Sequence, residues 1–208
     1  NGRPTFTEQA SIDGLTFMVD SLNKTKIVDP ASLTVSQEMA ANVFYAGDTA
    51  FFPQAWAGVY NYSNDPSVSR IVGQIKVADA VPAGAPGVRA TLNLPEALAI
   101  PTTSKNKDAA WKYIQYMTSV KKNKERALEI GALPIWKSLY NDPELLKLYP
   151  YWKQFGQQSQ YARGLPQLEW YDEFSYAQQV EVQKALMGEK TPKEALQAIY
   201  EKVKRYLR

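Results

Sequence analysis

The chain has 208 residues, of which 45% are hydrophobic and 22% are charged, and this balance excludes an intrinsically disordered protein. Its 24 basic and 21 acidic residues leave a net charge of +3, and this dispersed excess is too small to indicate a nucleic-acid-binding surface. The sequence contains no cysteine and no histidine, which excludes disulfides, Cys/His zinc sites and catalytic triads that use either residue.

The first residues, Asn1-Gly2-Arg3-Pro4, lack the apolar core of a signal peptide, and no stretch approaches the roughly 18 to 20 apolar residues of a membrane-spanning helix. We therefore expect the chain to begin inside a longer protein.

Two helices are predicted at the N-terminal end. Apolar residues at three- and four-residue steps indicate a helix over 7–22 that begins at Thr7. A second helix is predicted over 35–45, with Thr34 and Gln37 as a capping box and Gly47 as its stop.

The next part of the chain favours strands. Residues 48–53 read as a short buried strand that ends at Pro53, and β-branched residues over 69–82 suggest one or two more. A Gly/Pro loop at 82–89 is followed by a strand over 90–100 that is interrupted at a proline.

Beyond residue 101 the pattern is mainly helical. Helices are predicted over 106–119 and 121–130, and a further one begins after Asp142 with proline at its first position. Residues 157–168 read as irregular. A long helix is predicted over 171–187.

The last helix has the clearest start signal, with Thr191 as cap, proline next and Glu194 as the capping-box partner, and its buried stripe is expected to be Ala195, Ile199, Val203 and Tyr206. The strands are too few for a complete doubly wound sheet, which supports a missing partner segment.

Five segments in order along nearly the whole chain match patterns that one protein family shares. The five segments are residues 1–22, 43–57, 97–119, 131–145 and 188–199. In the second segment Gly47, Ala50 and Trp56 match the family pattern, and the third segment reads ALAIPTTSKNKDAAWKYIQYMTS. Together they resemble the family 1 extracellular solute-binding proteins of ABC sugar transporters, the relatives of maltose-binding protein. The chain departs from the family's paired glycines at Thr91–Glu96 and from its Arg-Pro at Arg163–Pro166, so the type of ligand stays open.

The resemblance implies an α/β, periplasmic-binding-protein-like fold of class II, whose two lobes close on a ligand like a clamp. This chain would be the C-terminal half, with helices predominating. Residues 1–104 would form part of the C-terminal lobe, 105–150 would be helices that pack on the N-terminal lobe, and 151–208 would return as the final helix pair. Without the N-terminal half, we expect Trp111 and Trp136 to be exposed.

Sugar recognition needs flat rings against the C–H faces of a pyranose and polar groups for its hydroxyls. The resemblance carries the family's stacking tryptophan onto Trp56, for which a core position is the alternative. Gln54 could bond hydroxyls or lie in an exposed loop.

Four other residues are candidates. Thr91 and Asn93 replace the family's glycines and offer hydrogen bonds, although Asn93 also suits a turn. Trp170 and Tyr171 would line the cleft, unless Trp170 packs on the loop at 157–168.

Arg163 could bind hydroxyls or a carboxylate, and its alternative is a salt bridge to Asp172 or Glu173. With Glu169, these carboxylates invite a glycosidase interpretation, but acids at a helix start are expected from the helix dipole alone.

The function implied is that of the substrate-binding component of an ABC importer, which is not an enzyme and which captures a sugar or oligosaccharide for a membrane permease. Its expected partners are that permease, a carbohydrate and the N-terminal half of the same protein, with no nucleic acid, cofactor or metal. It would be periplasmic or extracellular, with a lipid anchor on the missing N-terminus as one means of attachment. The alternatives are a binding protein for a polyamine, phosphodiester or peptide, a carbohydrate-active enzyme domain, and a helical adaptor.

Overall fold

A computed structural model describes residues 4–53, 56–78, 91–92, 94 and 96–207 of the chain. They form two compact units: a terminal unit, which combines Asn1–Ala40 with Pro166–Arg208, and a central unit, Ala41–Leu165. The expected division at 104 and 150 stays a prediction.

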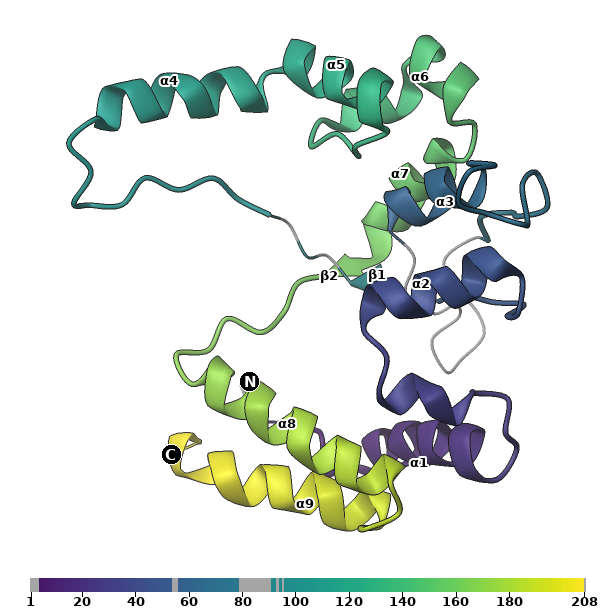
Figure 1. Cartoon of the computed structure of the whole chain (residues 1–208). Helices are drawn as coiled ribbons and strands as arrows, with labels where there is room; N and C mark the ends of the chain where they lie inside the picture. The colour runs from purple at the N-terminus through teal and green to yellow at the C-terminus, as the bar shows by residue number, and fades with distance from the viewer. Residues whose placement is uncertain (1–3, 54–55, 79–90, 93, 95, 208) are drawn as a thin grey trace. The chain divides into compact units, whose positions relative to one another are not determined.

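Three helices make the terminal unit: α1 (Gln9–Asn23), α8 (Tyr171–Leu186) and α9 (Pro192–Val203). Figure 1 shows α8 and α9 side by side, and α1 contacts both. Their shared core is rich in alanine, which lets the helices approach closely; it consists of Leu15, Ala177, Ala185, Ala195, Leu196 and Ile199. Short 3₁₀ turns, η1 (Pro30–Leu33) and η4 (Lys204–Tyr206), complete the unit.

The predicted stripe of α9 is confirmed in its first three members, which are fully buried, but it is wrong for Tyr206. Tyr206 lies in η4, beyond the end of α9, and is 39% exposed. Because the tighter 3₁₀ turn no longer follows the 3.6-residue period, its side chain leaves the buried face.

Helix starts were predicted with mixed success. The capping box of α9 is confirmed: Thr191 Oγ1 accepts from the backbone N–H of Glu194 at 3.2 Å, and the Glu194 carboxylate accepts from the backbone N–H of Thr191 at 2.8 Å. The capping role of Thr7 is wrong, because α1 begins one residue later, after Glu8.

The capping box at Thr34 is also wrong. Helix α2 (Gln37–Ala46) begins after Ser36, whose hydroxyl accepts from the N–H of Met39 at 3.3 Å, while the Thr34 hydroxyl donates to the carbonyl of Ala31 in the preceding turn. The predicted stop at Gly47 is confirmed.

The central unit contains α3 (Ala57–Ser63), α4 (Lys107–Thr118), α5 (Val120–Ile130), η2 (Lys137–Asn141), α6 (Pro143–Leu148), α7 (Trp152–Gln158) and η3 (Ser159–Tyr161). The predicted cap of α6 is confirmed, because the Asp142 carboxylate accepts from the N–H groups of Glu144 and Leu145. One core cluster joins α5, η2, α6 and α7 around the fully buried Trp152, and a second joins α2 to α3.

The strand predictions largely fail. Within the described residues 48–53 and 69–78 there is no strand, and Phe51, expected to be buried, is 87% exposed. Hydrogen bonds close turns there instead, as from Gln74 N–H to the carbonyl of Ile71. Residues 79–82 and the loop at 82–89 lie outside the described residues.

Among the described residues of the segment 90–100, only Thr91–Leu92 (β1) forms a strand, and it pairs in parallel with Ala162–Arg163 (β2). The predicted irregular segment 157–168 is therefore irregular only in part, because α7, η3 and β2 occupy its first seven residues.

Helix α4 is stabilised little by its own unit. None of its residues, all of which the structure describes, is buried, although its predicted apolar stripe is present. Trp111 on α4 is 54% exposed and Trp136 is 43% exposed, as expected. Among the described residues no helix is long and apolar enough to span a membrane.

A hydrogen bond joins α3 to the residue that precedes α7, close to the end of α5. Helix α5 ends at Gly131, whose φ of +65° favours glycine. A Cβ added there would lie 1.9 Å from Asn61 Nδ2, and Asn61 Oδ1 accepts from the hydroxyl of Tyr151 at 3.0 Å. This glycine therefore permits both the turn and the position of Asn61.

In the terminal unit, Glu181 on α8 is only 3% exposed. Its carboxylate accepts hydrogen bonds from Lys190, just before α9, and from Lys184 at 3.3 Å. The bond from Lys190 is the main cause that lowers the pKa of Glu181, and Lys184 acts in the same direction, while burial opposes both. The ion pair thus ties α8 to the turn that leads into α9.

We predict that Gly131→Ala lowers the free energy of unfolding by about 1 to 3 kcal/mol, because alanine disfavours the positive φ and meets the Asn61 amide. Urea denaturation measures it. Gly164→Ala is the control, since a Cβ added at Gly164 meets nothing within 4 Å. Equal effects of the two substitutions would show that Gly131 has no special role.

We further predict that Glu181→Gln lowers the free energy of unfolding at pH 7 by about 1 to 3 kcal/mol. Because the folded pKa lies below the ordinary value of 4.5, the contribution of Glu181 is present above that value and is lost as pH falls through the folded pKa. Urea denaturation between about pH 6 and pH 3 should therefore show a shallower loss of stability in the variant. The exposed Glu189→Gln is the control, and an unchanged pH profile for Glu181→Gln would contradict the role of the pair.

Candidate functional site

Trp56 lies at the point where the chain enters α3. It is the N-cap residue of that helix, with an extended backbone, and its side chain is half-buried. The indole packs on the cluster of Ala41, Tyr45 and Val59 and meets Phe52 edge to face, with the ring centroids 6.3 Å apart. The structure therefore leaves both interpretations of Trp56 open, as a core residue and as a stacking residue. Part of the indole packs on a core cluster, and part remains accessible.

Gly58 makes this position of the indole compatible with α3. A Cβ at residue 58 would lie 2.7 Å from Nε1 of Trp56, closer than side-chain atoms approach one another. The tryptophan therefore lies over the first turn of the helix only because residue 58 has no side chain.

Thr91 and Arg163 are brought together by the parallel pair of β1 and β2, across 71 intervening residues of sequence. In the register, Thr91 faces Ala162 and Leu92 faces Arg163. Because successive side chains of a strand alternate, Thr91 and Arg163 point to opposite faces of this ribbon. Thr91 is half-buried and Arg163 is exposed. Gln54 and Asn93 lie outside the described residues.

Trp170 and Tyr171 belong to the terminal unit, at the start of α8. Trp170 stacks nearly parallel on Tyr206, with the centroids 5.6 Å apart and an interplanar angle of 3°, and meets Phe174 edge to face at 6.3 Å. Tyr171 contacts the same phenylalanine at 6.1 Å. Both predicted residues are therefore half-buried members of an aromatic cluster.

Glu173 forms its ion pair with Arg205, whereas the partner considered from the sequence was Arg163. Its carboxylate accepts from the hydroxyl of Tyr206 and from Arg205 at 2.7 and 2.9 Å. The bond from Tyr206, followed by that from Arg205, lowers the pKa of Glu173. A glycosidase acid needs a raised pKa, so the electrostatics of Glu173 oppose that role.

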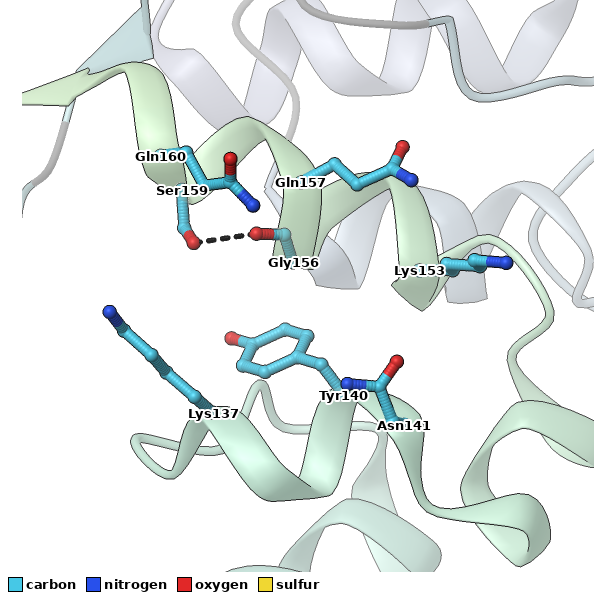
Figure 2. Close-up of a pocket in the computed structure, with 8 residues that line it drawn as sticks. All are labelled: Lys137, Tyr140, Asn141, Lys153, Gly156, Gln157, Ser159 and Gln160. Atoms are coloured by element: carbon cyan, nitrogen blue, oxygen red, sulfur yellow. Dashed lines mark hydrogen bonds between the residues drawn. The ribbon is translucent and has the colours of Figure 1, made fainter.

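One pocket of about 290 Å³ lies between η2 and α7. Figure 2 shows its lining, which is formed by Lys137, Tyr140, Asn141, Lys153, Gly156, Gln157, Ser159 and Gln160. None of the residues predicted to bind ligand lines it. The sequence gives no signal for it, since its two sides come from separate segments without a shared motif. In the described part of the chain, no cluster of three acidic side chains could hold a metal ion.

The sequence pattern of bacterial extracellular solute-binding proteins matches residues 1–124, more than half of the chain. The chain belongs to this family. Members of the family are solute-binding proteins of transporters and not enzymes. A probable ABC transporter-binding protein of Deinococcus radiodurans is 35% identical over 123 residues, which are 59% of this chain and 29% of that protein. A maltotriose-binding protein of Pyrococcus abyssi is 40% identical over 62 residues, 29% of this chain and 14% of that protein.

Two solved structures of solute-binding proteins match almost the whole chain. Maltose-bound MalE3 of T. maritima has a TM-score of 0.85 and 26% identity, over 99% of this chain and 52% of that one. An ABC transporter solute-binding protein of Agrobacterium radiobacter K84 in complex with ribitol has a TM-score of 0.79 and 22% identity, over 98% of this chain and 51% of that one. The fold is therefore that of a class II periplasmic-binding protein, and the chain spans about half the length of these structures.

Proposed function

We propose that the chain is part of the substrate-binding component of an ABC importer, which captures a sugar or a related polyol and delivers it to a membrane permease. The observation that carries this proposal is the match of 99% of the chain to a maltose-bound structure, at a TM-score of 0.85 and 26% identity. The shorter match to a maltotriose-binding protein and the ribitol in the second solved structure support the same class of ligand.

The proposal includes a second lobe from polypeptide outside this chain. The matched structures contain about as much chain again as the part that this sequence covers. In this proposal residues 105–150 pack on that lobe and bury Trp111 and Trp136, which are both exposed here. Burying such surface on association is the dominant favourable term in most protein interfaces.

Trp56 would supply the flat ring on which a pyranose lies. Its support is the half-buried indole at the entrance to α3 and the resemblance of its segment to the stacking tryptophan of the family. Hydroxyl groups would bond to Gln54, Thr91, Asn93 or Arg163, and Trp170 and Tyr171 are proposed as further aromatic contacts of the ligand. The family is extracellular, and we propose that a lipid anchor on the N-terminal part holds the protein at the membrane.

We predict that Trp56→Ala weakens maltose binding about tenfold or more, because it removes a stacking face from the sugar. Isothermal titration calorimetry on the chain combined with its N-terminal lobe measures the dissociation constant. Tyr176→Ala is the matched control, since Tyr176 is an aromatic residue that is 68% exposed on α8 and is outside the proposed site.

A thermal-shift screen separates the ligand class from the fold. Sugars or polyols should raise the melting temperature of the combined lobes, since a ligand that binds the native state stabilises it. If only a polyamine, phosphodiester or peptide raises it, the sugar assignment is wrong and the importer role stands. Cleavage of an oligosaccharide by the protein would instead contradict the importer role.

A further inference from the structure

The pocket between η2 and α7 is positively charged. Its eight lining residues include Lys137 and Lys153, and none of the eight is acidic. Among the described residues neither lysine forms an ion pair. Figure 2 shows their ammonium groups at opposite ends of the lining, and no carboxylate of the lining balances the charge of either group.

The nearest acidic residues in the sequence are occupied elsewhere. Asp142, which follows the lining residue Asn141, accepts from Lys124 Nζ at 2.9 Å and also caps α6. Glu144 binds the same ammonium group at 2.9 Å. The bond from Lys124 is the main cause that lowers the pKa of Asp142, so this carboxylate stays charged and paired. These two carboxylates are therefore paired with Lys124 and not with Lys137.

Neutral polar groups share the pocket with these lysines. Figure 2 shows Lys137 and Tyr140 of η2 facing Ser159 and Gln160 across the gap. The Ser159 hydroxyl donates to the carbonyl of Gly156 at 2.7 Å, so its oxygen can still accept a hydrogen bond. Gln160 is exposed, so its side-chain amide is accessible to a ligand.

Tyr140 is a fixed hydrogen-bond donor at the base of this arrangement. Its ring lies 6.1 Å from that of the buried Trp152, and its Cβ would be 3.1 Å from a Cβ added at Gly156. Burial raises the pKa of Tyr140, which keeps its hydroxyl protonated at neutral pH. A ligand in this pocket would thus meet a protonated hydroxyl as well as the ammonium group of Lys137.

We propose that this pocket binds a small organic anion that also carries hydroxyl groups, namely a sugar acid or a sugar phosphate. Lys137 would pair with the carboxylate or phosphate, and Tyr140, Ser159 and Gln160, which lie on the same side of the pocket in Figure 2, would bond to the hydroxyls. A volume of about 290 Å³ suits a ligand with one ring. None of the residues proposed to bind the imported ligand lines this pocket, so binding here is tested separately from theirs.

Calorimetric titration of the full chain at low salt with glucuronate, glucose 6-phosphate, glucose and inorganic phosphate tests the proposal. The two acidic sugars should bind with a dissociation constant of about 1 mM or tighter, and glucose at least about tenfold more weakly. The tighter of the two acids identifies the anionic group. If neither acid binds, or if inorganic phosphate alone binds as tightly as glucose 6-phosphate, the proposal is wrong.

Variants then locate the binding. Lys137→Gln should weaken binding of the tighter acid about tenfold, and Tyr140→Phe, which keeps the ring and removes the hydroxyl, about threefold to tenfold. Lys147→Gln is the matched control, because this exposed lysine of α6 does not line the pocket. An equal loss with Lys147→Gln would show attraction by overall charge and overturn the site, and circular dichroism verifies that each variant is folded.

Discussion

Helix α4 presents an apolar stripe that its own unit does not cover. A helix of 12 residues has little stability in water by itself, and most helical stability in proteins comes from burying one face. Since no residue of α4 is buried and Trp111 is half exposed, the described residues leave the apolar stripe of this helix uncovered. The matched structures, about twice as long as this chain, contain additional polypeptide that can provide it.

The terminal unit, unlike α4 of the central unit, buries the apolar faces of its helices against one another. Its three helices share one core, the capping box fixes the start of α9, and a buried ion pair joins α8 to the turn before α9. The two parts of the sequence that build it lie 125 residues apart, so the chain leaves this unit after residue 40 and returns at residue 166. A two-lobed binding protein in which the chain crosses between lobes is consistent with such a path.

Local signals in the sequence predicted the longer helices but neither α3 nor α7. Thr191 and Asp142 each combine a side-chain acceptor with a following proline, so their helix starts are determined within four residues. The strand predictions failed because a strand does not depend on local signals alone. A strand is stabilised by pairing with other strands, and the segments at 48–53 and 69–78 have no strand partner among the described residues. Phe51 is exposed accordingly.

The candidate site was predictable only in part. The segment around Trp56 is recognisable from its resemblance to a family pattern, and its position before α3 agrees with a residue that is partly core and partly accessible. The opposite orientations of Thr91 and Arg163 depend on strand register, which no local pattern encodes. The contacts of Trp170 with Tyr206 and the pocket at η2 likewise join segments that are distant in sequence.

The most direct measurement is a crystal structure of the chain assembled with its second lobe and soaked with maltose. We expect the indole of Trp56 to lie within about 4 Å of a pyranose ring and Trp111 to be buried beneath the second lobe. A structure in which Trp56 is enclosed in the interior away from any sugar, or in which Trp111 remains exposed, would contradict the role proposed for this chain.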